Sequence, residues 1–190
     1  MLRRARRQAA RYVAALETFA RRDVPIIGIA PSCILTLRDE YLELLPGDGA
    51  AAAVARQARL IEEFLTEPQA DGLQPIERLN FREAPRPLAV HGHCYVKALV
   101  GTGPTVSMLR ASGADVTEIE CGCCGMAGSF GYEAEHLELS RRIAEETLLP
   151  AMRAAAAEGR MLVAGGVSCR TQIADGTGTR AVHPVEALAA

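Results

Sequence analysis

The feature that most constrains this fold is an alternation of short β-branched runs with longer helical segments. Runs rich in valine, isoleucine and other apolar residues occur at Val24–Ala30, Pro87–Val90 and Met161–Gly165, and a helical pattern follows each of them. Such alternation is typical of βαβ units and of a mainly parallel sheet. We therefore predict an α/β fold, a mainly parallel sheet with flanking helices.

Periodicity, proline and glycine place the other expected elements. Further strands are expected at 115–120, 79–82 and 181–182, and helices at about 2–22, 34–45, 50–66, 104–112, 134–158 and 185–189. Residues 68–86 are proline-rich with little periodicity, so we expect them to connect residues 1–67 with residues 87–190 within one compact unit.

The N-terminal segment is rich in arginine and has no acidic residue before Glu17. That composition is compatible with an organelle transit peptide, but the segment lacks the serines that such peptides contain. Leu2, Val13, Leu16 and Phe19 can share one stripe of a helix, which favours a surface helix instead.

Charge and hydropathy exclude two classes of partner. The formal net charge is −2, with acidic and basic residues interspersed, which argues against nucleic acid as the main partner. No apolar run approaches the roughly 20 residues of a membrane-spanning helix. We expect a cytoplasmic protein that reaches the inner face of a membrane only through its partners.

The chain has six cysteines, and each follows a predicted strand. They are Cys33, Cys94, Cys121, Cys123, Cys124 and Cys169. Because the carboxyl ends of parallel strands share one edge, cysteines remote in sequence are expected to converge there. We see no export signal, and in a reducing compartment clustered cysteines indicate metal binding or redox chemistry rather than disulfides.

The densest cluster is Glu120-Cys-Gly-Cys-Cys-Gly-Met-Ala-Gly128, with three thiols in four positions. Thiolates are soft ligands suited to iron–sulfur clusters, zinc and copper(I). A mononuclear zinc site more often uses spaced CxxC pairs, which this chain lacks. Inert buried thiols or a vicinal disulfide remain the alternative.

Two further patterns add candidate ligands. In His91-Gly-His93-Cys94 we take Cys94 as a ligand and the two histidines as capping or hydrogen-bonding groups around the metal. Cys33 and Cys169 lie in matching Ser-Cys turns, IIGIAPSCILTL and LVAGGVSCRTQI, which indicates two pseudo-repeated halves. No GxGxxG, GxSxG, HExxH or Walker A motif is present, so no flavin or nicotinamide site is expected in this chain.

These motifs resemble a known family. Four segments are similar to the cysteine-rich CCG domain of glycolate oxidase iron–sulfur subunits, lactate-utilisation proteins and heterodisulfide reductases. They are HGHC, CCGMAGSFGYE, GVSCRTQI and APSCILTLRDEY. The sequences of Pro31–Tyr41 and Cys123–Glu133 are most similar to the C-terminal iron–sulfur part of FAD-linked D-2-hydroxyacid (D-lactate-type) dehydrogenases. The resemblance covers about residues 24–188.

The resemblance implies a [4Fe–4S] centre and an electron path from a flavin on a partner domain or subunit. Its ligand candidates are Cys94, Cys123, Cys124 and Cys169, with Cys33 as a possible fifth. The chain departs from the family in having only the tail of the first cysteine repeat, a single Cys169 in place of a final CxxC, and the extra Cys121. We therefore expect a fragment of a longer protein, which would self-associate or bind a flavin-containing dehydrogenase.

Three functions follow from these patterns. The preferred one is an iron–sulfur electron-transfer domain of a flavin-linked dehydrogenase acting on D-lactate, D-2-hydroxyglutarate or glycolate, with no activity expected from this chain alone. The alternatives are a zinc-stabilised structural or interaction domain and a thiol or heterodisulfide reductase-like subunit.

Overall fold

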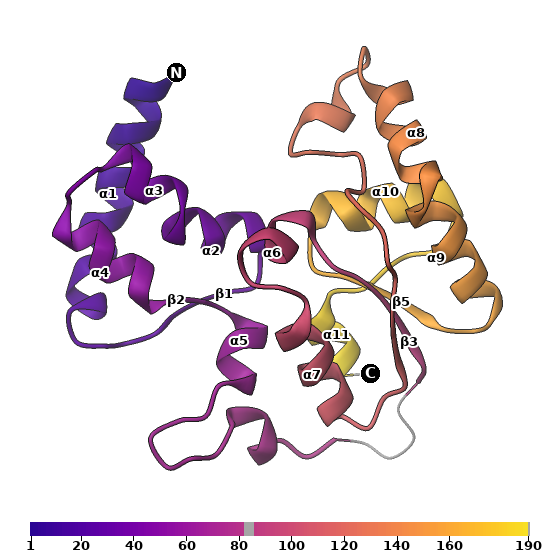
Figure 1. The fold of residues 1–190 in the computed structure, drawn as a ribbon, viewed down its shortest axis with the longest axis horizontal. Coiled ribbons are helices and arrows are strands. Elements are labelled where there is room, and N and C mark those ends of the chain that lie inside the picture. Colours follow the sequence, from indigo (N-terminus) through magenta and orange to yellow (C-terminus); the bar gives the residue numbers. More distant parts are fainter. Residues whose placement is uncertain (82–85, 190) are drawn as a thin grey trace. The chain divides into compact units, whose positions relative to one another are not determined.

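The computed structural model describes residues 1–81 and 86–189. The chain divides into two units, Met1–Phe64 and Leu65–Ala190. Parallel β-strands with helices packed against them occur in both units, so the predicted α/β class is confirmed (Figure 1).

The first unit surrounds two short parallel strands, with Ile26 beside Ala58 and Gly28 beside Leu60. Its elements are α1 (Leu2–Ala20), β1 (Ile26–Gly28), α2 (Pro31–Arg38), α3 (Glu40–Leu44), α4 (Gly49–Gln57), β2 (Ala58–Leu60) and the start of α5 (Ile61–Thr66). Helix α1 packs on α4, and the alanines and valines at their contact permit a close approach of the two backbones. The N-terminal segment is therefore a helix with one buried stripe.

The expectation of one helix over 50–66 is wrong. At Ala58 the backbone becomes extended, with φ −71° and ψ 125°, and β2 supplies a hydrogen-bonding partner for β1. The Glu63 carboxylate then accepts a hydrogen bond from the Leu60 amide at 2.9 Å, where α5 begins. Unpaired strand edges are costly when buried, and that tertiary requirement overrides the local helical pattern.

Two other expectations for this unit need correction. The helix expected at 34–45 begins at Pro31, whose fixed φ suits a first helical turn, and it breaks at Asp39. Leu2 and Phe19 are exposed and do not share the buried stripe of α1 with Val13. The stripe instead uses small residues such as Ala9.

The second unit contains a three-stranded parallel sheet of order β4-β3-β5, which Val182 extends by a single bridge to Val163. Its elements are η1 (Pro75–Arg78), β3 (Leu88–His91), α6 (Cys94–Leu99), α7 (Gly103–Ala111), β4 (Val116–Glu118), η2 (Phe130–Tyr132), α8 (Leu137–Glu146), α9 (Leu148–Ala157), β5 (Met161–Ala164), α10 (Val167–Thr177) and α11 (Pro184–Leu188).

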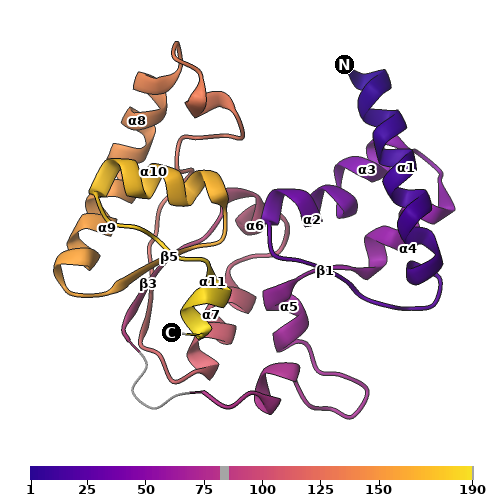
Figure 2. The same ribbon diagram turned by 180° about the vertical axis from the view of Figure 1, so that it is seen from behind.

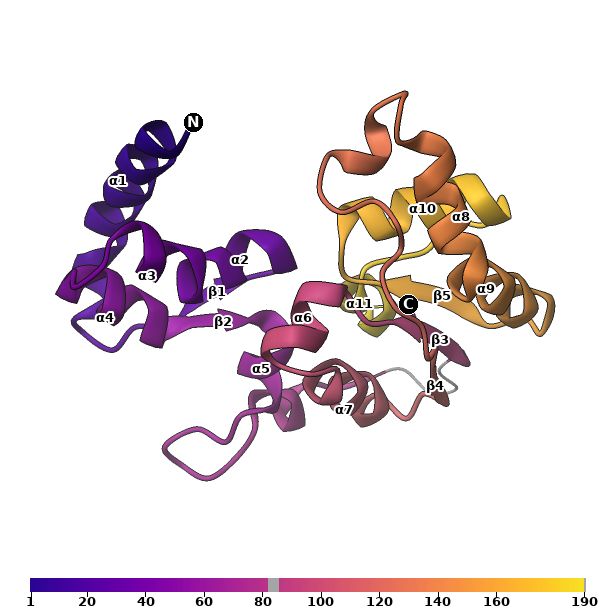
Figure 3. The same cartoon turned by 45° about the horizontal axis from the view of Figure 1, so that its top comes forward.

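Helices cover both faces of this sheet. Ala89 and Leu162 pack with residues of α9 and α10, whereas Val90 and Val163 pack with residues of α7 and α11. Figure 2 shows the sheet from behind, and in Figure 3 α7 lies below the strands and α10 above them. Burial on both faces explains why β3 and β5 consist almost wholly of apolar residues.

Two expectations for this unit also differ from the structure. The helix expected at 134–158 is two helices that meet at Thr147, because Pro150 has no N–H for the carbonyl of Glu146 and its ring crowds that carbonyl. Residues 79–81 form no strand, and Arg82, the end of that expected strand, lies outside the described residues. Helix α6 was not expected from the sequence.

Candidate metal centre

The candidate site lies at the carboxyl edge of the sheet of the second unit. Strand β3 is central, with β4 on one side and β5 on the other, so the loops after these strands diverge around the end of β3. Open parallel sheets form a crevice at such a switch point. His91 is the last residue of β3, Cys94 begins α6 after it, the loop after β4 carries the Cys-Gly-Cys-Cys-Gly segment, and α10 after β5 carries Cys169.

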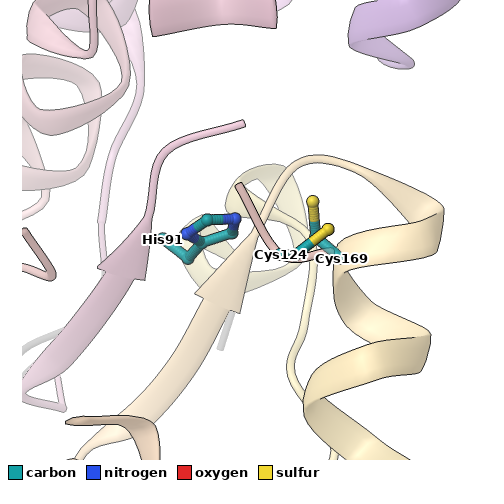
Figure 4. Close-up of side chains that lie close together, drawn as sticks. All are labelled: His91, Cys124 and Cys169. Atoms are coloured by element: carbon teal, nitrogen blue, oxygen red, sulfur yellow. The ribbon is translucent and has the colours of Figure 1, made fainter. Parts of the chain in front are cut away.

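Three buried residues form the inner part of the site. Ligand atoms of His91, Cys124 and Cys169 all lie within 4.8 Å of one another. Figure 4 shows the His91 ring at the end of its strand and the two sulfur atoms beside the start of α10. The exposed fractions of these residues are 1%, 3% and 1%, so bulk water does not reach this part of the site.

Cys94 and Cys123 form the outer part. Cys94 is the first residue of α6 and is exposed, Cys123 is partly buried, and their thiols are hydrogen-bonded to each other. Burial and the neighbouring Cys123 raise the pKa of Cys94, and both residues act electrostatically on Cys169. All six cysteines of the chain are free thiols. The sulfurs of Cys124 and Cys169 therefore lie together, and Cys94 and Cys123 are near enough to act on Cys169 electrostatically.

The two buried thiols of the inner part, Cys124 and Cys169, have pKa values shifted in opposite directions. The pKa of Cys124 is lowered, chiefly because the Cys169 thiol hydrogen-bonds to its sulfur and secondarily because of the His91 ring. The same bond, together with burial, raises the pKa of Cys169. Cys124 is thus the more acidic thiol of the pair, and thiolate is the form that binds soft metals.

Two glycines permit this close packing. Gly125 has φ +87°, and a Cβ there would lie 2.2 Å from the carbonyl oxygen of Ser140, so only glycine fits. Its amide donates to the Cys123 sulfur at 3.3 Å. A Cβ on Gly166 would lie 2.4 Å from His93 Cδ2 and 3.0 Å from the Cys169 sulfur.

The two histidines have different roles. His93 Nδ1 accepts a hydrogen bond from the Tyr95 amide at 3.2 Å and so caps α6, while burial lowers its pKa. His91 Nδ1 lies 3.1 Å from the Cys121 sulfur. Burial alone would lower the pKa of His91, but the interaction with the neighbouring sulfurs of Cys121 and Cys124 outweighs that effect and raises it.

Several residues that the sequence analysis did not select also shape the site. The Lys97 ammonium donates to the carbonyl oxygen of Cys121. Buried Gln172 donates to both the carbonyl and the hydroxyl oxygen of Ser140, whose hydroxyl in turn contacts Met126 Sδ at 3.6 Å. A polar side chain on the buried face of a predicted helix was the available signal for Gln172 and Ser140.

Cys33 belongs to the first unit, where it is exposed in the first turn of α2. It is the third residue of its helix, as Cys169 is of α10, and each helix follows a parallel strand. Cys33 lines a mainly apolar cavity of about 680 Å³, together with Tyr12 and Tyr41. Its role as a possible fifth ligand stays a prediction.

Comparison with known proteins relates the chain to dehydrogenases. It is 33% identical over 192 residues to D-2-hydroxyglutarate dehydrogenase of Pantoea ananatis, which covers 98% of this chain and 17% of that protein. Over 177 residues it is 33% identical to the Escherichia coli K12 protein of the same name, with 91% of this chain and 16% of that protein covered.

A second kind of relative is one subunit of a larger dehydrogenase. The chain is 29% identical over 191 residues to a subunit of the anaerobic glycerol-3-phosphate dehydrogenase of Escherichia coli K12, which covers 98% of this chain and 45% of that relative. The chain thus spans less than half of each of these relatives. No protein-family model matches the sequence. Among the described residues, no helix is both long and apolar enough to cross a membrane.

Proposed function

We propose that this chain is an iron–sulfur electron-transfer domain that serves a flavin-linked 2-hydroxyacid dehydrogenase. The observation that carries the proposal is the meeting of His91, Cys124 and Cys169 at one sheet edge, with their ligand atoms within 4.8 Å of one another, where Cys94 and Cys123 also act electrostatically on Cys169. Similarity to D-2-hydroxyglutarate dehydrogenases and to one subunit of a glycerol-3-phosphate dehydrogenase supports a place in such an oxidoreductase.

The donor set fits a [4Fe–4S] cluster. The Cys124 and Cys169 thiols lie side by side, the pKa of Cys124 is lowered, and glycines leave room for the backbone to approach a bulky group. Cys94, Cys123, Cys124 and Cys169 would hold the cluster, which when bound takes up and passes on single electrons.

The residues around the donors keep them in place. Cys169 lies in the first turn of α10, which holds its sulfur beside that of Cys124. Burial of Cys124 and His91 excludes water from the inner part, and Lys97 fixes the loop through the Cys121 carbonyl. In the proposed role, these residues bind and shield a redox centre and carry out no substrate chemistry.

A zinc-stabilised domain is the second candidate. The trio of His91, Cys124 and Cys169 has the compact donor arrangement of a mononuclear site, and Cys94 or Cys123 would supply a fourth ligand. The thiol reductase-like alternative would require a disulfide substrate beside the cluster, and no feature of the described residues favours it.

Metal analysis of an anaerobic preparation decides between the two candidates. A brown protein with iron and acid-labile sulfide in near-equal amounts is expected. A colourless protein with one zinc per chain would overturn the iron–sulfur assignment and favour the structural site.

The partnership has its own test. The flavin is assigned to a partner domain or subunit, so the purified chain should show no dye-linked oxidation of D-lactate, D-2-hydroxyglutarate or glycolate. Co-purification with a flavoprotein dehydrogenase, and light scattering of the chain alone, would detect the partner and any self-association. Oxidation of a hydroxyacid by the flavin-free chain, or a chain that stays monomeric and does not bind the flavoprotein, would contradict this assignment.

A further inference from the structure

The strongest unexplained feature of the site is one nitrogen of His91. The side chain is 1% exposed, and its Nε2 makes no hydrogen bond of normal geometry within the described part of the chain, although the ring is near enough to Cys124 to interact with its sulfur. A buried polar atom without a partner destabilises the folded state, so native proteins rarely keep one without a reason. An absent ligand is one such reason.

The other nitrogen is already engaged. His91 Nδ1 lies 3.1 Å from the Cys121 sulfur, and Cys121 is held in turn through its carbonyl oxygen by Lys97. In the tautomer whose ring proton is on Nδ1 and directed at this sulfur, Nε2 carries the lone pair that can bind a metal. Metal-binding histidines characteristically use one nitrogen in this way to fix the ring while the other binds the metal.

The direction of the ring fits a ligand. His91 is the last residue of β3, the central strand, so its side chain lies at the switch point between the loops of β4 and β5. A ligand atom of its ring lies within 4.8 Å of the sulfurs of both Cys124 and Cys169. In Figure 4 a ring nitrogen is on the side that faces these two sulfur atoms.

We infer that His91 is itself a metal ligand, through Nε2, and that Cys121 is the residue that orients it. This inference rests on the proposed function for the presence of a metal, but it changes the ligand set from all-cysteine to mixed cysteine and histidine. It also gives Cys121, the extra thiol, a positioning role. Histidine ligation raises the potential of an iron–sulfur centre relative to all-cysteine ligation.

The test uses the unmodified chain labelled with ¹⁵N-histidine. Pulsed electron paramagnetic resonance of the reduced cluster should show one strongly coupled nitrogen whose signal changes with the label. That signal should vanish in His91→Ala and persist in His93→Ala, which removes the capping histidine two residues away. A cluster whose only nitrogen couplings are weak and insensitive to the label would overturn the inference.

The role of Cys121 has a matched pair of variants. Cys121→Ser keeps a hydrogen-bond acceptor beside Nδ1, whereas Cys121→Val removes it. Loss of such a supporting bond typically lowers metal affinity about 10- to 100-fold. We expect Cys121→Val to lose metal faster to a chelator and to shift the midpoint potential, with Cys121→Ser close to the parent. If the two variants lost metal at the same rate and had the same midpoint potential, Cys121 would not be the residue that orients His91.

The experiments distinguish a wrong assignment of His91 as a ligand from a wrong assignment of the chain as an iron–sulfur protein. Iron and sulfide without a coupled histidine nitrogen would leave the electron-transfer assignment intact and overturn the ligand. If the protein holds zinc instead, X-ray absorption at the zinc edge takes the place of the resonance experiment. A mixed nitrogen and sulfur shell would then support His91, and four sulfurs would refute it.

Discussion

Gln172 Nε2 lies 3.1 Å from both the carbonyl and the hydroxyl oxygen of Ser140, and this pair connects α10 to α8 beside the Cys-Gly-Cys-Cys-Gly loop. Gln172 follows Cys169 by three residues on the same helix, and the Ser140 backbone packs against Gly125. The contact therefore couples the helix that carries Cys169 to the loop that carries Cys123 and Cys124.

Replacing Gln172 with leucine should destabilise the second unit. Leucine fits the buried volume but leaves the oxygens of Ser140 without their donor, which costs about 1–3 kcal/mol. Urea unfolding of the cluster-loaded chain measures the loss. Thr171→Ala, on the less buried face of α10, is the control and should cost under about 1 kcal/mol. Equal decreases in the free energy of unfolding for the two variants would show that the Gln172–Ser140 hydrogen bonds do not stabilise the second unit measurably.

Gly125→Ala should prevent metal loading, whereas Gly122→Ala should not. Gly125 has a positive φ and no room for a Cβ beside the Ser140 carbonyl, while a Cβ on Gly122 meets nothing within 4 Å. Iron content and visible absorbance of the two variants, prepared side by side, are the measurements. A brown Gly125→Ala protein would mean that the loop relaxes without disturbing its thiols.

Much of this arrangement could be read from the sequence. The β-branched runs predicted β1, β3, β4 and β5, and the position of each cysteine after a strand predicted that remote thiols meet at one edge. The matching Ser-Cys turns predicted that Cys33 and Cys169 occupy equivalent helix starts. These features depend on local periodicity and on parallel-sheet topology, which a sequence expresses directly.

Other features depend on tertiary contacts and were missed. Strand β2 exists because β1 needs a neighbour, although Ala58–Leu60 fits a helical pattern equally well. The environment of His91 depends on Cys121, thirty positions away, which pattern alone does not place beside it. The Gln172–Ser140 contact joins two helices whose register only packing decides.

Substitution of single thiols should separate ligands from their neighbours. Cys123→Ser and Cys124→Ser each replace a soft donor with a hard oxygen and should abolish cluster assembly. Cys121→Ser should retain most of the iron, because Cys121 contacts His91 and is not itself proposed as a ligand. Iron, sulfide and visible absorbance distinguish these outcomes. Loss of iron from Cys121→Ser as complete as from the other two would make Cys121 a ligand.

The first unit should become less stable as pH rises between about 4.5 and 6, because of Glu62 in α5. Glu62 is 4% exposed, and burial raises its pKa from 4.5 to about 6. Between those values the unfolded chain has released this proton while the folded chain keeps it, so raising the pH favours unfolding. A shift of this size corresponds to about 2 kcal/mol, present below pH 4.5 and lost above pH 6.

Glu62→Gln should remove this pH dependence and stabilise the first unit at pH 7 by about 1–2 kcal/mol, since the amide has no charge to bury. Hydrogen exchange of the α4 and β2 amides, followed from pH 4 to 8, reports the opening free energy of this unit separately from the metal centre. Glu43→Gln, at an exposed position of α3, is the control and should change little. If the parent chain and Glu62→Gln lost stability in parallel over this range, burial of Glu62 would not be the cause, and another group of the first unit would have to release the proton.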